Sequence, residues 1–142
     1  MSEQEVIRVL QRHVEAENNH DLARTLATLH PDCTLEEVAF GAVYRGRSGA
    51  ADHYRAWWDA FELRFRSGAE GVEHVTTAGA VVAEGRFFGR HVGAFRGLAP
   101  TGRDVDFRFA VVVSFEDGLI AGERFYFDRA TLWAQLGVGG SA

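Results

Sequence analysis

An aromatic stripe in residues 48–65 constrains the fold more than any other feature of this sequence. Its members recur at the i, i+3, i+4, i+7, i+11 spacing of one helix face and are Tyr54, Trp57, Trp58, Phe61 and Phe65. So wide an apolar face needs a broad partner, and a curved β-sheet is a partner of that kind. The pattern therefore predicts an aromatic helix packed on a bent sheet.

Two further helices are indicated before this one. Ser2 is an N-cap candidate with Glu5 three residues later, and the apolar spacing that follows predicts a helix to about Asn18. Asp21 is placed to cap a second, shorter helix, which Pro31 is expected to end.

The rest of the chain is typical of β-structure. A first strand is predicted at residues 33–40, with Glu36 and Glu37 facing opposite sides. Later strands are predicted at residues 71–79, 80–93, 103–115 and 119–128, with a tight hairpin turn at 116–118. Three helices followed by an antiparallel meander predict one α+β domain over residues 1–137, with a flexible tail at 138–142.

Residues 89–107 form a loose connection between two of these strands. Gly93, Gly97 and Gly102 are expected to supply bulges and turns there that bend the sheet. Strong curvature makes a concave face, and helices that close such a face leave a pocket.

Composition argues against several classes of function. The net charge of -5 gives no basic surface for nucleic acid, and the apolar runs are too short to cross a membrane. The single Cys33 can form neither an intramolecular disulfide nor, alone, a zinc site, which favours a cytoplasmic protein. The histidines lack the spacing of known metal sites and no glycine-rich phosphate loop occurs, so we expect no metal and no cofactor.

Several segments together resemble the SnoaL-like polyketide cyclases of the nuclear transport factor 2 superfamily, which also contains ketosteroid isomerase. They are NNHD (18–21), LHPDCTLEE (29–37), YRGRSG (44–49), GRHVGAFRGLAPTGR (89–103), FEDGLIAGERFYFD (115–128) and LWAQLG (132–137). The resemblance implies a cone-shaped, curved antiparallel sheet with three N-terminal helices that enclose an apolar pocket. It also implies a homodimer formed through the outer face of the sheet.

Asp128 and His91 are the first catalytic candidates. The resemblance places Asp128 where these cyclases carry their acid/base aspartate, and a carboxyl beside an apolar cavity has a raised pKa suited to moving a proton from carbon. A cap on the helix that follows is the alternative for Asp128. His91 resembles a histidine of the family and would assist at a developing enolate oxygen, or else serve a structural purpose.

Glu37 matches, through DCTLEE, the catalytic base of ketosteroid isomerase, an enzyme in which the surroundings tune the pKa of carboxyl groups for catalysis. His13 stands where that enzyme has a tyrosine, and FAVVV (109–113) lacks its second acid, which argues against steroid isomerisation. Glu37 is therefore a candidate second acid or substrate-orienting group, with a solvent-facing glutamate as the alternative.

A larger set is predicted to bind the substrate. From the first helix these are His13 and Glu17, and the remaining members are Tyr44, His53, Trp57, Trp58, Phe61, Phe87, Arg108 and Tyr126. The aromatic members equally suit a packed core, and Arg108 and Tyr126 equally suit cross-strand pairs.

The favoured function is a cofactor-independent cyclase that closes an apolar, polyketide-like carbonyl compound by an intramolecular aldol reaction. Epoxide opening or hydroxylation is an alternative, for which Arg108 or Arg124 beside Asp128 would be the place to look. A module that only binds a small molecule or dimerises is the second alternative.

Overall fold

The computed structural model describes residues 1–62, 64–67, 74–77 and 80–139. The elements in these residues are α1 (Glu3–Asn18), α2 (Leu22–Ala27), β1 (Leu29–Glu37), the 3₁₀ helix η1 (Val38–Phe40), β2 (Ala42–Arg45), α3 (Gly46–Ala60), β3 (Arg64–Ser67), β4 (His74–Thr77), β5 (Ala80–Arg90), β6 (Asp104–Glu116), β7 (Leu119–Phe127) and α4 (Arg129–Gln135). Apart from β4, the predicted strand 71–79 lies outside the described residues. None of the described helices is long and apolar enough to span a bilayer.

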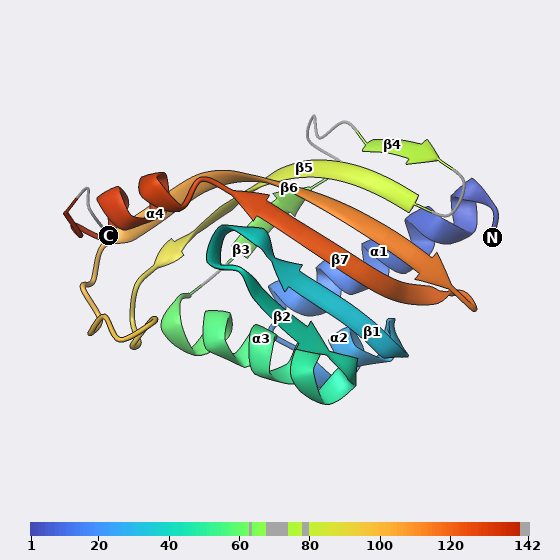
Figure 1. Cartoon of the computed structure of the whole chain (residues 1–142), viewed down its shortest axis with the longest axis horizontal. Coiled ribbons are helices and arrows are strands. Elements are labelled where there is room, and N and C mark those ends of the chain that lie inside the picture. The colour runs from blue at the N-terminus through green and yellow to red at the C-terminus, as the bar shows by residue number, and fades with distance from the viewer. Residues whose placement is uncertain (63, 68–73, 78–79, 140–142) are drawn as a thin grey trace.

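The described strands form one sheet in the order β2-β1-β7-β6-β5-β3, and β4 also pairs with β5. Neighbouring strands are antiparallel except β1 and β7, which run parallel. Figure 1 shows the long strands β5, β6 and β7 bending along the molecule, with α1, α2 and α3 on one side of them. The predicted α+β fold with a curved sheet and three N-terminal helices is confirmed, and the parallel pair is an exception to the expected antiparallel order.

Local sequence signals fix several element ends as predicted. The Ser2 hydroxyl accepts the Glu5 N–H at 3.2 Å while the Glu5 carboxylate accepts the Ser2 N–H at 2.8 Å, which is a capping box at the start of α1. Asp21 caps α2 by accepting a backbone N–H from its first turn. Asp117 and Gly118 both have positive φ and form the predicted hairpin turn between β6 and β7.

The second helix ends earlier than the sequence pattern predicts. α2 stops at Ala27, and Leu29 lies in β1, where it pairs with Ile120 of β7. Both side chains are fully buried. Because so short a helix has little stability of its own, burial in the sheet decides the structure here. β1 therefore includes Pro31, and the predicted strand 33–40 gives way to η1 at its end.

The aromatic helix also ends before its predicted limit. α3 stops at Ala60, whose carbonyl oxygen accepts the Gly93 N–H at 3.0 Å. Phe61 forms an isolated bridge with His91, and Phe65 lies in β3. Pairing with the edge of the sheet therefore overrides the helical pattern after residue 60.

The aromatic face of α3 packs on the sheet as predicted. Trp57 is 4 % exposed, and its ring lies nearly parallel to that of Phe87 on β5, with centroids 6.0 Å apart. Phe61 and phenylalanines from β6 and β7 complete this aromatic core. Trp57, Phe61 and Phe87 were expected to line a pocket, but in the structure they belong to this packed core. Aromatic rings pack closely, face to face and edge to face, in an interior without water.

Val138 belongs to the folded domain rather than to the predicted tail. It packs against the aromatic core, and its N–H donates to the Trp133 carbonyl at 2.9 Å. Residues 140–142 of that tail lie outside the described residues.

Gly93→Ala tests the contact at the end of α3. An added Cβ would lie 2.1 Å from the Asp59 carbonyl oxygen, which the helix backbone holds in place. We expect the free energy of unfolding, measured by urea denaturation, to fall by about 1–3 kcal/mol, as at other overpacked sites. Gly139→Ala is the matched control because nothing lies within 4 Å of the added atom. Equal stability of the two variants would contradict this account of the contact.

Candidate functional site

Glu37, at the end of β1, is a buried carboxylate surrounded by donors. It is 2 % exposed and pairs with Phe125 in the register of β1 and β7. His53 Nδ1 lies 2.5 Å and Trp57 Nε1 3.2 Å from its Oε2, and both residues come from adjacent turns of α3. From the loop after β5, Arg96 Nη2 donates to Oε1 at 3.3 Å. The sequence-based expectation that Glu37 and Glu36 face opposite sides is met, because Glu37 points toward α3.

These donors keep Glu37 ionised. Burial raises the pKa of Glu37, but the hydrogen bond and electrostatic attraction of His53, with smaller effects from Trp57 and Arg96, hold the pKa below its ordinary value. Burial and the nearby Glu37 carboxylate raise the pKa of Tyr44, which hydrogen-bonds to it. An ionised Glu37 accepts the Nδ1 proton of His53, which leaves Nε2 as the ring nitrogen that does not contact Glu37.

Arg96 connects this buried group to the surface. Its backbone has φ 47°, in the left-handed region, and its guanidinium carbon lies 3.6 Å from the centroid of the Phe40 ring. The Arg96 side chain is 36 % exposed while that of Glu37 is 3 % exposed. The guanidinium therefore forms the outer wall of the Glu37 group.

His91 anchors the loop that carries Arg96. Its N–H donates to the Arg103 carbonyl at 2.8 Å, and its ring Nδ1 accepts the Thr101 N–H at 3.0 Å. Burial lowers the pKa of His91, so the ring is neutral with its proton on Nε2, which has no hydrogen-bond partner among the described residues. Its predicted catalytic role stays a prediction.

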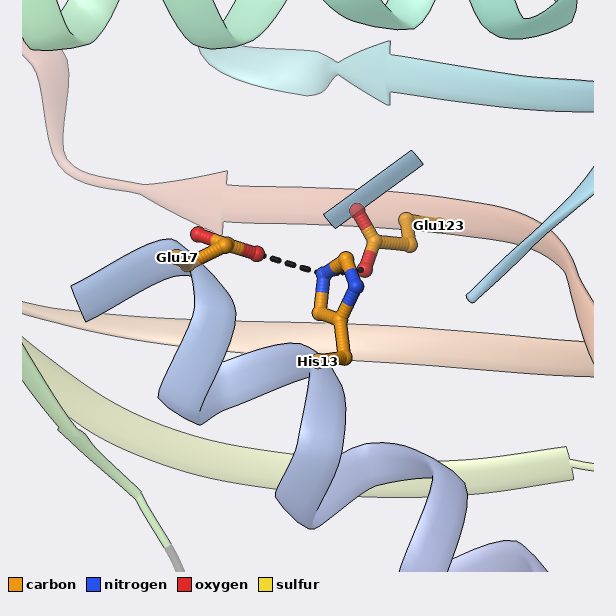
Figure 2. A group of neighbouring side chains, drawn as sticks. All are labelled: His13, Glu17 and Glu123. Atoms are coloured by element: carbon orange, nitrogen blue, oxygen red, sulfur yellow. Dashed lines mark ion pairs between the residues drawn. The ribbon is translucent and has the colours of Figure 1, made fainter. Parts of the chain in front are cut away.

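A second polar group joins α1 to β7. Figure 2 shows the carboxylates of Glu17 and Glu123 on either side of the His13 ring. His13 Nε2 lies 2.5 Å from Glu17 Oε1, one helical turn away, and 3.2 Å from Glu123 Oε1. Tyr54 of α3 hydrogen-bonds to Glu123, and its hydroxyl lies 3.3 Å from the same nitrogen. On the other side of the ring, Nδ1 lies 2.7 Å from Thr28 Oγ1.

The hydrogen bonds of His13 make its ring a cation. Thr28 donates its single hydroxyl proton to the Thr25 carbonyl at 2.6 Å, so its oxygen accepts a proton from His13 Nδ1. Nε2 faces two carboxylates and therefore also carries a proton. Burial alone would lower the pKa of His13, but Glu17 and Glu123 outweigh burial and raise it to about 10. Burial favours a raised pKa for Glu123, yet His13 above all holds that pKa below its ordinary value.

The two groups form one row in which acids and bases alternate, which we call the polar row. His53 lies between them, with its ring centroid 4.9 Å from that of Tyr54, and after His13 it is a further cause of the lowered pKa of Glu123. In order, the polar row is Arg96, Glu37, His53, Glu123, His13 and Glu17. Every acid in it lies beside a base, which offsets the cost of burying its charge.

Most of the predicted site residues lie in or beside the polar row. Those in contact with it are Glu37, Tyr44, His53, Trp57, His13 and Glu17. Trp58 stacks on His20 and Tyr54, with centroids 4.9 and 5.4 Å away. Phe61 and Phe87 belong to the aromatic core instead.

Asp128 lies on the surface, and the prediction that it projects into an apolar cavity is wrong. Its carboxylate accepts the Ala130 N–H at 3.1 Å and the Thr131 hydroxyl at 2.6 Å. These bonds cap α4, and the Thr131 hydroxyl is the main cause of a pKa below the ordinary value, not the raised one expected. The alternative of a helix cap describes its observed position.

The predicted placement of Arg108 and Tyr126 at the pocket is also wrong. Arg108 is exposed between the buried Phe107 and Phe109, so strand alternation turns it to the opposite face of the sheet. Tyr126 is 39 % exposed, and its hydroxyl accepts a proton from Arg124 Nε at 3.2 Å. Asp128 hydrogen-bonds within α4 instead. The described residues therefore do not place it in the acid–arginine group that was considered for epoxide opening.

Sequence reasoning missed Glu123, Arg96 and Tyr54 as members of the site. Glu123 had a readable signal, because it shares the inward side of β7 with Phe125 and Phe127 and is the polar exception on that side. Tyr54 was recognised only as part of the aromatic stripe. Arg96 lies in a loop, where no periodicity reports the direction of a side chain.

Comparison with known proteins assigns the family. The family model of the SnoaL-like polyketide cyclases matches residues 7–136. The chain belongs to this family. No curated protein sequence gives a significant match.

Solved structures of several other proteins share the fold over nearly their full length. TsrD from Streptomyces laurentii is 26% identical with a TM-score of 0.84, over 98% of this chain and 99% of that chain. A protein described as a polyketide cyclase, from Xanthomonas campestris pv. campestris, is 21% identical with a TM-score of 0.83, over 94% and 97%. An LEH-like epoxide hydrolase from M. tuberculosis is 22% identical with a TM-score of 0.73, over 94% and 90%. One scaffold thus carries different chemistries, so the reaction must be argued from the site.

His13→Gln tests the charge state of the second group. With a pKa raised from 6.5 to about 10, the stabilisation by His13 is complete below pH 6.5 and is lost as the pH rises to about 10. At pH 6 we expect the variant to be less stable by about 3–5 kcal/mol, because two acids lose their buried partner. Urea denaturation in metal-free buffer should show this gap narrowing steadily toward pH 10. A gap that stays constant over that range would mean that His13 is not a cation in the folded protein.

Proposed function

We propose that this SnoaL-like chain is a cofactor-independent acid–base enzyme that closes a ring in an apolar carbonyl compound by an intramolecular aldol reaction. The observation that carries the proposal is the pair of Glu37 and His53. A buried, ionised carboxylate holds one ring nitrogen at 2.5 Å and thereby fixes which nitrogen of His53 faces the substrate.

His53 is the general base in this proposal. Its Nε2 removes a proton from the carbon between or beside carbonyl groups, and the Nδ1–H bond to Glu37 stabilises the imidazolium that forms. The enolate carbon then attacks the second carbonyl carbon of the same molecule. His53 returns the proton to the alkoxide oxygen, so the ring closes without a net change in protonation.

Arg96 supports the negative charge that develops on oxygen. Arg96 is anchored on Glu37 yet is partly exposed, so its guanidinium is available to an enolate oxygen at the outer end of the group. The Tyr44 ring lies 5.3 Å from that of His53, and Phe40 lies under Arg96. These aromatic surfaces suit a flat, polyketide-like substrate that must be held in a folded conformation.

His53→Gln tests the assignment of the base. We expect the rate of carbon-proton exchange in an aryl β-keto ester, followed by NMR in deuterium oxide, to fall by about 10²- to 10⁴-fold, the usual contribution of a general base. Glu37→Gln should cause a loss of the same order, because it no longer stabilises the imidazolium. Ring closure of a candidate polyketide, followed by product analysis, is the second readout.

Asp128→Asn is the matched control for this experiment. Its carboxylate is exposed and engaged with α4, so exchange should continue at close to the wild-type rate. Far-UV circular dichroism verifies that all variants are folded. A folded His53→Gln variant with wild-type exchange, or an Asp128→Asn variant that loses it, would contradict the proposal. Tight binding of the ester without any exchange in the wild type would favour a module that only binds a ligand.

A further inference from the structure

The polar group around His13 brings three atoms of the kind that bind metals close together inside the fold. His13 Nε2 and one carboxylate oxygen each from Glu17 and Glu123 lie within 4.8 Å of one another. His13 and Glu17 come from consecutive turns of α1, and Glu123 comes from β7, as Figure 2 shows. The His13 side chain is 3 % exposed and the two carboxylates are 14 % and 13 % exposed.

The group brings together more acids than bases. Two carboxylates, from Glu17 and Glu123, face the single His13 ring in a largely buried place. His53, the next base in the polar row, is hydrogen-bonded to Glu37 instead. A divalent cation that replaces the Nε2 proton, with that proton released to solvent, would make the group neutral. We propose that His13, Glu17 and Glu123 form a binding site for a divalent first-row transition-metal ion.

The geometry fits such an ion with a small adjustment. Bonds of about 2.1 Å from a metal to nitrogen and oxygen place neighbouring ligand atoms about 3.0–3.4 Å apart. The distance from His13 Nε2 to Glu123 Oε1 is already 3.2 Å, while Glu17 Oε1 at 2.5 Å must withdraw by less than an ångström. Glu17 is able to do so because it is a partly exposed side chain at the end of α1.

The surrounding residues already orient the ligands. Thr28 gives its own proton to Thr25 and accepts from His13 Nδ1, so it directs the Nε2 lone pair toward the two carboxylates once the Nε2 proton has left. Tyr54 hydrogen-bonds to Glu123 and supports the second ligand in the same way. Partners of this kind hold metal ligands in place in known sites.

The partly exposed side chains of Glu17 and Glu123 are the ligands nearest solvent, and a groove lies on the other, Thr28 side of the His13 ring. It has a volume of about 460 Å³ and runs along α1 and α2, where Thr28 is part of its wall. Three protein ligands leave coordination positions for water, and one imidazole with two carboxylates suits zinc, manganese, cobalt or iron(II). An all-oxygen preference makes magnesium a poor match for a site with an imidazole.

The hairpin between β6 and β7 supplies an internal control. His30, Glu116 and Asp117 also bring ligand atoms within 4.8 Å of one another. Here His30 Nδ1 accepts the Asp32 N–H at 3.0 Å, so Nε2 carries the proton that it donates to Asp117. Both acids are exposed, and this group lacks the buried, preoriented nitrogen that His13 has.

Titration of the chelator-treated full-length protein tests the proposal. Isothermal calorimetry with ZnCl₂ and visible absorption with CoCl₂ should both report one equivalent of metal per chain, whereas MgCl₂ should not compete. Glu17→Gln should raise the dissociation constant by more than about a hundredfold, since loss of even an orienting partner weakens metal binding by about 10- to 100-fold. Thr28→Val should raise it by about 10- to 100-fold. His30→Gln should leave it unchanged.

The variants are chosen so that loss of folding is not mistaken for loss of the site. Glu17 is partly exposed near the end of a helix, and circular dichroism verifies that each variant is folded before titration. Three results would overturn the proposal: no saturable binding of Zn²⁺ or Co²⁺ to the wild type, unchanged binding in folded Glu17→Gln, or binding that disappears in His30→Gln. None of these results depends on the aldol chemistry proposed for Glu37 and His53.

Discussion

The polar row from Arg96 to Glu17 is the constraint on which the rest of this structure depends. A buried carboxylate is costly unless hydrogen bonds and an opposite charge accompany it, and removing one partner costs more than the pair contributes. Glu37, Glu123 and Glu17 each lie beside a base, so the members of the row hold one another in place. Because the acids and bases come from α1, β1, β7, α3 and the loop after β5, those elements must meet in one arrangement.

The same arrangement divides the interior into an aromatic core and the polar row. Phenylalanines of β5, β6 and β7 pack around Trp57 and give the sheet a solid aromatic core. Trp57 also donates to Glu37, so it ties that core to the polar row. Within the row, the pair of Glu37 and His53 suits proton transfer, whereas His13 between two acids suits the holding of a cation. The two proposals therefore assign two kinds of polar chemistry to neighbouring parts of one set of contacts.

Local signals made part of this predictable from the sequence. The Ser2 capping box, the turn at Asp117 and the opposite directions of Glu36 and Glu37 each depend on a few neighbouring residues, and all three agree with the structure. The group around His13 depends on the register between α1 and β7, elements more than a hundred residues apart, and no spacing rule encodes it. Asp128 was open to two interpretations, a cap or a cavity acid, and only the position of α4 relative to the sheet separates them.

The protonation of the histidines is the most direct measure of the polar row. Long-range ¹H–¹⁵N NMR of the imidazole nitrogens, in metal-free buffer at pH 8, distinguishes a cationic ring from each neutral tautomer. The account predicts two protonated nitrogens on His13 and a neutral His91 with its proton on Nε2. A neutral His13 at that pH would show that the buried carboxylates do not hold a cation between them, which would contradict this account of the polar row.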